Sequence, residues 1–115
     1  MKYFNRSEFE CQCGCGFDVV DYELGEVLDE LREHYQSPVT INSGCRCKTH
    51  NKAIGGAASS THILGKAADV VVHEVPSDDV YEYLSSKYAY KYGVGKYTGR
   101  THIDVRSAKA RWDNS

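Results

Sequence analysis

The stretch STHILGKAADVVV, residues 60–72, decides how this chain folds. Its second half, residues 67–72, is a short apolar run that follows Gly65 and predicts a buried strand. Asp69 is the only charge in that strand, and a buried carboxylate needs a cation, a metal or a dense set of donors. His62 lies seven residues earlier, and Gly65 lets the chain turn back so that both side chains reach one point.

A further pair of polar residues lies in the run THIDV, residues 101–105. Side chains alternate between the two faces of a strand, so His102 and Asp104 share a face. His62, Asp69 and His102 together offer two imidazoles and one carboxylate, which leave the fourth position of tetrahedral zinc open for water or substrate. Spacing alone leaves another interpretation open, in which the histidines are ordinary core or surface residues and Asp69 caps a loop.

Two segments predict the principal helices. Residues 21–36 place apolar side chains on one face, carry acidic residues in the first turns and are followed by Pro38, which is typical of an amphipathic helix. Ser77 is the expected N-cap of a second helix, because Asp78 and Asp79 follow it in the first turn.

Short β-branched or alternating segments predict the remaining elements. Residues 39–42 favour a strand, and residues 48–54 favour a short helical turn. Residues 92–97 and 101–105 predict a hairpin joined by residues 98–100. The expected fold class is therefore α+β, with two principal helices on a small, mainly antiparallel sheet.

Length and charge exclude several classes of protein. A chain of 115 residues is long enough for one domain, residues 1–115, and we expect a monomer. Because 14 basic residues stand against 16 acidic ones, nucleic acid is not expected as the main partner. The start of the chain has no apolar signal-peptide region, and the longest aliphatic run, residues 70–72, is too short for membrane insertion.

The five cysteines are odd in number and lie in two close clusters, which argues against a disulfide framework and for a reducing compartment. Cys11, Cys13, Cys15 and Cys47 are candidates for a second, structural Zn²⁺ site. Their C-x-C-x-C spacing departs from the common C-x(2–4)-C pattern and crowds three thiolates within five residues. Sequence alone leaves the role of this cluster open.

Several motifs in the chain resemble the M15 zinc peptidases. That family includes D-alanyl-D-alanine carboxypeptidases and phage endolysins, and it shares a fold with the hedgehog signalling domain. The resemblance covers nearly the whole chain and implies a hedgehog/D-Ala-D-Ala-peptidase-like fold. The motifs that carry it are residues 4–16, SGCRCKTHN at 43–51, GGA at 55–57, the stretch 60–69, GVGKY at 93–97, THIDVR at 101–106, and RW at 111–112.

The resemblance also implies roles for individual residues. By it, His62, Asp69 and His102 are the ligands of one catalytic Zn²⁺. Arg46 matches an arginine implied to hold the substrate carboxylate or to polarise the scissile carbonyl, tasks that suit a planar, permanently charged guanidinium. The alternative for Arg46 is a surface ion pair. Ser60 is expected to donate to the substrate within the site or to shape the loop.

The general base is where this chain departs from part of the family. Several relatives carry an acidic residue three positions before the last zinc histidine, and here that position is Gly99. Asp104 is therefore the candidate base, and its alternative role is to orient His102 or to pair with Arg106. Cys45 stands where many relatives have a tyrosine, so we expect it to be a packing residue.

The implied function is zinc-dependent hydrolysis of peptide bonds in peptidoglycan stem peptides, by a carboxypeptidase or an endopeptidase. The absence of a signal peptide suggests a phage or prophage lysin that stays in the host cytoplasm before its release to the cell wall. Two alternatives remain open: a non-catalytic zinc-containing binding module of the hedgehog type, and a cysteine-rich zinc module that binds a protein partner.

Overall fold

A five-stranded sheet with the order β1-β2-β4-β3-β5 organises the computed structural model, which describes residues 1–115. Neighbouring strands are antiparallel except for β3 and β5, which run parallel. The predicted α+β class and the mainly antiparallel sheet are thus confirmed. The strands are β1 (Val39–Ser43), β2 (Ala67–Val72), β3 (Gly93–Tyr97), β4 (Arg100–Asp104) and β5 (Ala110–Asp113).

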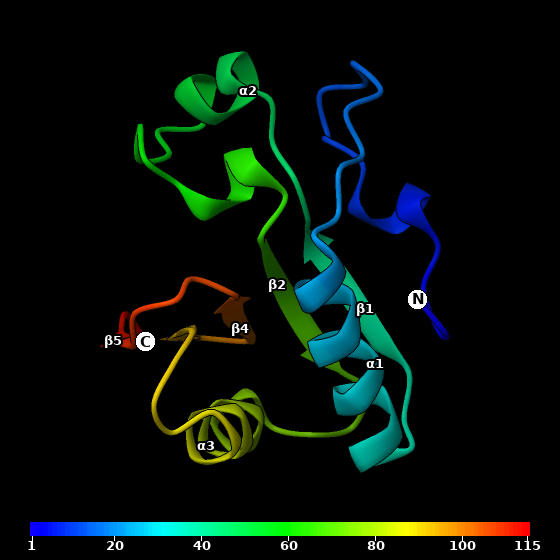
Figure 1. Ribbon diagram of the computed structural model, residues 1–115, viewed down its shortest axis with the longest axis vertical. Helices are drawn as coiled ribbons and strands as arrows, with labels where there is room; N and C mark the ends of the chain where they lie inside the picture. The colour runs from blue at the N-terminus through cyan, green and yellow to red at the C-terminus, as the bar shows by residue number, and fades with distance from the viewer.

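The helices lie at different places around this sheet. Figure 1 shows α1 in front of β1 and β2, with α2 at one end of the molecule and α3 at the other. The two principal helices predicted from sequence are α1 and α3, and the predicted turn at 48–54 is α2. The bounds are α1 (Tyr22–Tyr35), α2 (Lys48–Ala53) and α3 (Ser77–Lys87), with 3₁₀ turns η1 (Arg6–Phe9) and η2 (Thr61–Leu64).

The core is formed where α1 packs on the sheet. Leu24, Leu28 and Leu31 lie on one face of α1 and are at most 1% exposed. They belong to the same apolar cluster as Val70 and Val72 of β2. Each such side chain contributes about 1.5–3 kcal/mol by leaving water, so this packing fixes β2 and the polar residues at its start.

The start of α3 differs from the sequence prediction. Pro76 is the N-cap residue and makes no side-chain hydrogen bond, whereas Ser77 is the first helical residue. The Ser77 hydroxyl donates instead to the carbonyl of Tyr97 in β3, at 3.5 Å. The prediction of Ser77 as N-cap was therefore wrong, because the hydroxyl is used for a contact between α3 and the sheet.

Strand β5 was not expected from sequence. It pairs with β3 in parallel register, so that Gly95 lies opposite Trp112. The guanidinium of Arg111 donates to the carbonyls of Tyr92, at 2.7 Å, and Tyr88, at 2.6 Å. A side chain at position 95 would clash with the Trp112 indole, so glycine at this position makes room for it. These contacts join residues distant in the chain and leave no local pattern in the sequence.

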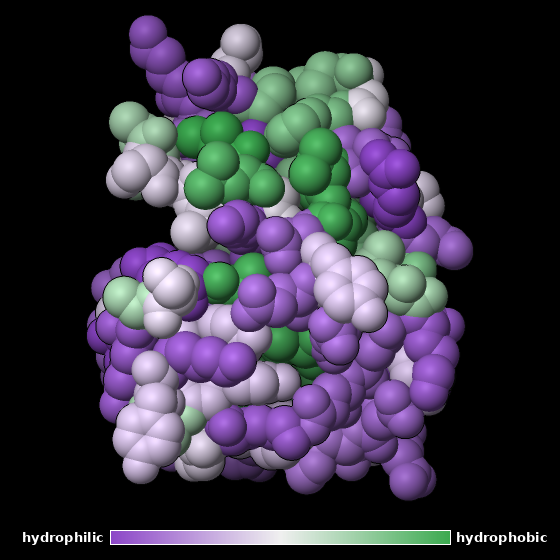
Figure 2. All heavy atoms as spheres, in the orientation of Figure 1, coloured by the Kyte–Doolittle hydropathy of each residue, from purple (hydrophilic) through white to green (hydrophobic).

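None of the helices combines the length and the apolar character that a membrane span requires. Much of the face of the molecule that Figure 2 shows is polar, and the molecule is hollowed at the side, between the part that carries α2 and the part that carries β4 and β5. Five of the residues expected from sequence line a cleft: Arg46, Ser60, His62, Asp69 and His102.

Candidate metal centre

A cleft of about 650 Å³ lies between the loops around α2 and the strands β3, β4 and β5. Most of its walls are polar, and they include three arginines and a single carboxylate, that of Asp69. The site residues on its walls are Arg46, Ser60, His62, Asp69, Arg100, His102, Arg106 and Trp112.

Three expected ligands come together on the floor of this cleft. Asp69 of β2 lies directly opposite His102 of β4 in the antiparallel register, and His62 is in η2. The Asp69 carboxylate lies 3.1 Å from Nδ1 of His102 and 3.6 Å from Nε2 of His62. One ligand atom from each residue lies within 4.8 Å of the others. The donors of the three residues thus converge as a metal centre requires.

The His62 ring is held from behind by the backbone. Its Nδ1 lies 2.6 Å from the carbonyl oxygen of Gly44, which can only accept, so Nδ1 carries the proton and Nε2 is left as the ligand atom. The Ser60 hydroxyl accepts from the backbone N–H of His62 at 3.2 Å and so caps η2. Both contacts fix the direction of the ring, which is only 2% exposed.

A carboxylate holds the His102 ring in the same way. Nε2 of His102 donates to Asp104 at 2.7 Å, so Nδ1 faces Asp69. Burial lowers the pKa of His102, but the hydrogen bonds to Asp104 and Asp69 outweigh it and raise the pKa above its ordinary value. For Asp69, burial raises the pKa, but the hydrogen bonds from His102 and His62 hold it well below the usual range. Asp69 therefore keeps its negative charge although its side chain is only 17% exposed.

Asp104 is completely buried and lies behind the wall of the cleft. Its Oδ1 accepts from Arg106 Nε at 2.8 Å and from the Gly93 N–H at 3.2 Å. Its Oδ2 accepts from Arg106 Nη2 and from His102 Nε2, both at 2.7 Å. Burial raises the pKa of Asp104, but these hydrogen bonds hold it far below its usual range. Both oxygens thus serve to fix neighbouring side chains.

Arg46 reaches the cleft from the segment between β1 and α2. Its backbone N–H donates to the carbonyl of His62 at 3.0 Å, while its side-chain Nε is buried without a hydrogen-bond partner. Burial lowers the pKa of Arg46, and the nearby Asp69 opposes that effect. A buried donor without a partner is the feature expected of a group that awaits an anionic ligand.

Two further residues of the cleft had no predicted role. Arg100 starts β4, and the ring of Trp112 in β5 lies tilted against that of His102, with ring centroids 5.0 Å apart and an interplanar angle of 49°. The indole N–H of Trp112 donates to the Tyr97 hydroxyl at 2.9 Å, which fixes the ring. Only the resemblance of the RW motif at 111–112 pointed to this wall.

The structure also brings together the cysteines proposed as a second metal site. The sulfur atoms of Cys11, Cys13, Cys15 and Cys47 all lie within 4.8 Å of one another. Cys45 stays apart and is buried, and its thiol lies within hydrogen-bond distance of two carbonyl oxygens, those of Phe9 at 3.2 Å and Phe17 at 3.0 Å.

The chemistry of the first site fits zinc. Two imidazoles with fixed tautomers and one carboxylate, set in an open cleft, are typical of a zinc-dependent hydrolase. The sequence model of the family described as Peptidase M15 matches residues 2–104 of this chain. The chain therefore belongs to the M15 peptidase family, a family of metallopeptidases. No curated protein matches the chain significantly.

Proposed function

We propose that this protein is a zinc peptidase that hydrolyses peptide bonds in peptidoglycan stem peptides. The observation that supports it best is the convergence of His62, Asp69 and His102 in the cleft, with every ligand atom within 4.8 Å of the others. A zinc ion bound there supplies Lewis acidity toward the carbonyl and lowers the pKa of water to about 7. The protein's own residues supply substrate binding and the orientation of the metal ligands.

The metal ligands are oriented by hydrogen-bond partners that lie on the far side of each histidine ring. The Gly44 carbonyl sets the tautomer of His62, and Asp104 sets that of His102. Such partners of metal ligands typically change metal affinity or activity 10–100-fold when they are removed. We assign Asp104 to this positioning role, because both of its oxygens are engaged.

Substrate binding falls to Arg46. Arg46 lines the cleft together with Arg100 and Arg106, and its buried Nε has no partner within the protein. A planar guanidinium binds a carboxylate with two parallel hydrogen bonds, so the free carboxylate of a stem peptide matches this wall. Replacement of Arg46 by lysine keeps the charge but removes the fork, and we expect it to raise KM more than it lowers kcat.

The second candidate function is a non-catalytic zinc module of the hedgehog type. It is favoured by the lack of a free acid: Asp69 is the only carboxylate that lines the cleft. Asp104 can serve as the general base only if one of its oxygens leaves Arg106 or His102. The two functions therefore differ in whether the zinc-loaded protein cleaves anything.

Digestion of purified peptidoglycan tests the proposal. Zinc-loaded protein is expected to release muropeptides, a chelator is expected to stop the reaction, and added zinc is expected to restore it. His62→Ala is the inactive control, and His73→Ala, which replaces a largely exposed histidine outside the cleft, is the active one. Cleavage that survives zinc removal, or no cleavage by fully loaded protein, contradicts the hydrolase.

Mass spectrometry of the products then assigns the bond. Loss of a single terminal residue identifies a carboxypeptidase, whereas separation of cross-linked peptides identifies an endopeptidase. The phage or prophage lysin context, release from the host cytoplasm to the cell wall and the monomeric state stay predictions. A lysis assay on intact cells, with the protein added from outside, and a measurement of molar mass in solution test them.

A further inference from the structure

We propose that Cys11, Cys13, Cys15 and Cys47 bind a second zinc ion, in a closed structural site outside the cleft. The inference does not depend on the peptidase activity, because it concerns different residues on a different part of the chain. It rests on the distances between the sulfur atoms, on the backbone conformation that brings them together, and on the two segments of the chain that the cluster connects.

The sulfur atoms have the spacing of a tetrahedral thiolate site. A zinc–sulfur bond of about 2.3 Å places the sulfurs of such a site roughly 3.8 Å apart. The sulfurs of Cys11 and Cys13 are 3.5 Å apart, those of Cys11 and Cys47 are 3.8 Å apart, and those of Cys13 and Cys47 are 3.7 Å apart. A disulfide requires about 2.05 Å, so these contacts are not disulfides. Cys15 completes the group within 4.8 Å.

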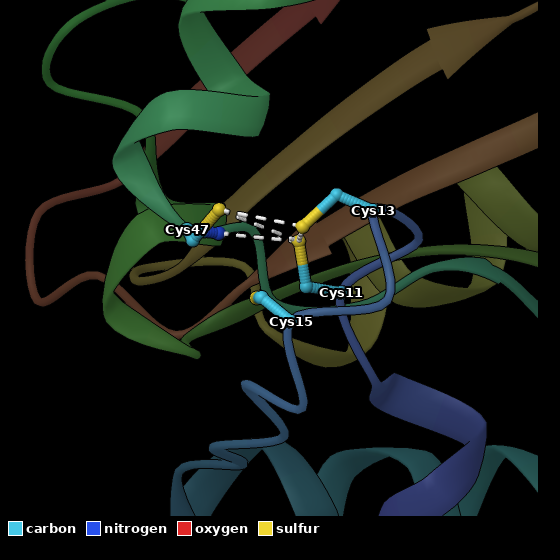
Figure 3. Close-up of side chains that lie close together, drawn as sticks. All are labelled: Cys11, Cys13, Cys15 and Cys47. Atoms are coloured by element: carbon cyan, nitrogen blue, oxygen red, sulfur yellow. Dashed lines mark hydrogen bonds between the residues drawn. The ribbon is translucent and has the colours of Figure 1, made fainter.

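The backbone removes the steric objection to three thiolates within five residues. Gly14 and Gly16 adopt φ angles of +83° and +87°, which side chains other than that of glycine rarely allow. The N–H of Gly14 donates to the carbonyl of Cys11, and the N–H of Cys11 donates to the carbonyl of Phe17. These two bonds close the loop on itself, and Figure 3 shows the sulfur atoms of Cys11 and Cys13 side by side, facing Cys47, with Cys15 next to them.

Cys47 comes to the cluster from the start of α2, as Figure 3 also shows. Its backbone N–H donates to the sulfur of Cys11 at 3.4 Å, and its own sulfur accepts from the N–H of His50 at 3.3 Å. N–H groups directed at sulfur stabilise the thiolate form that a metal requires. Since cysteines supply all four ligands, the site has no open position for substrate and is structural.

The cluster fastens the amino-terminal segment to the segment that supports the cleft. Residues 44–47 lie between β1 and α2, and within them Gly44 holds His62 while Arg46 enters the cleft. The N–H of Cys45 donates to the carbonyl of Phe9 in η1, at 3.0 Å. Metal bound at the cysteines would thus stabilise both the fold and the position of His62.

Metal analysis of the full chain tests the site without reference to activity. The wild type is expected to hold two zinc ions per chain, and the double variant His62→Ala, His102→Ala is expected to hold one. X-ray absorption at the zinc edge of that variant is expected to show sulfur alone, at about 2.3 Å. A variant without zinc, or with zinc bound by nitrogen or oxygen, overturns the proposal.

Cysteine variants give a matched comparison. Cys13→Ser removes an exposed ligand, and it is expected to lose one zinc ion and to lower the midpoint of thermal unfolding by about 5 °C or more. Cys45→Ser alters the buried cysteine outside the cluster and is expected to keep both ions. If Cys13→Ser retains two zinc ions, the proposal is wrong. It is also wrong if wild-type protein with its full zinc content has a disulfide bond among the four cysteines.

If Cys13→Ser fails to fold, the visible absorption spectrum of the intact cysteine cluster loaded with Co²⁺ tests the proposal instead. Co²⁺ replaces zinc in the double histidine variant, which retains all four cysteines. Intense thiolate-to-cobalt charge-transfer bands with the strong visible bands of tetrahedral cobalt are expected. The weak visible spectrum of six-coordinate cobalt without charge-transfer bands contradicts a site made of four cysteines.

Discussion

The histidine–aspartate centre and the cysteine cluster lie near the two ends of one short segment, residues 44–47, yet they are built differently. In the first, Asp69 and His102 are neighbours across paired strands, and each histidine ring has its second nitrogen bonded to a fixed acceptor. In the second, the sulfurs are carried by a glycine-containing loop and by the start of α2. Strand register thus positions the first group, whereas local loop conformation positions the second.

The largest effect is expected from the loss of the carboxylate between the two histidines. Asp69→Ala removes the group that faces both rings, so hydrolysis is expected to fall to background and one of the two zinc ions to be lost. Muropeptide release and metal content measure this. Asp78→Ala, which removes a largely exposed acid, is the control. If Asp69→Ala retains both zinc ions and its activity, Asp69 is not a ligand that the histidine–aspartate centre requires.

A smaller effect is expected behind the metal centre. Asp104→Asn weakens the contact that orients His102, so zinc affinity at the centre is expected to fall about 10–100-fold while the cysteine cluster keeps its ion. Competition with a chelating indicator measures the affinity. A large fall in kcat with unchanged zinc affinity would contradict the positioning role and assign Asp104 as the base.

A change in the wall beside His102 is expected to act mainly on stability. Gly95→Ala pushes a methyl group into the Trp112 indole, and overpacking of this kind costs about 1–3 kcal/mol. Urea denaturation followed by tryptophan fluorescence measures the loss, because the chain has a single tryptophan. An unchanged unfolding midpoint would show that β5 can shift to accept the methyl group, so that Gly95 is not needed for the packing of Trp112.

The smallest effect concerns the loop of the cysteine cluster. Gly14→Ala meets no neighbouring atom, so its cost, about 1–2 kcal/mol, comes from the backbone angle alone. Gly99→Ala in the β3–β4 turn has a similar angle and equally open surroundings. Both variants are expected to lose similar stability, but only Gly14→Ala is expected to bind the cysteine-site zinc more weakly. Equal zinc affinity in the two variants would show that the φ angle of Gly14 does not affect zinc binding at the cysteine cluster.

Much of the fold could be predicted because its signals are local. The apolar run 67–72 coincides with β2, and the amphipathic pattern at 21–36 differs from α1 by one residue at each end. Strand β5 could not be predicted, since Arg111 and Trp112 are fixed by partners more than ten residues away. The wrong cap at Ser77 has the same origin, because its hydroxyl bonds to a distant strand.

The candidate site divides in the same way. A charge in an apolar run and a period of two made His62, Asp69 and His102 candidates, and the resemblance to the M15 peptidases made them the expected ligands, which the structure brings together. The same pattern placed Asp104 near His102 but left its role open, because only the buried contacts to Arg106 show that both oxygens are engaged. The cysteine spacing argued against a metal site until the φ angles of Gly14 and Gly16 were known.

Gly44 has a consequence for attempts to recombine this protein with its relatives. Its carbonyl directs His62, and a side chain at position 44 would come within 2.5 Å of the Phe9 backbone. The segment around Phe9 and residues 44–47 thus lie in close contact, so we expect that they can be exchanged only together. A chimera that takes one of them from a relative and leaves the other behind is expected to misalign His62, whereas a transfer of both together is expected to preserve it.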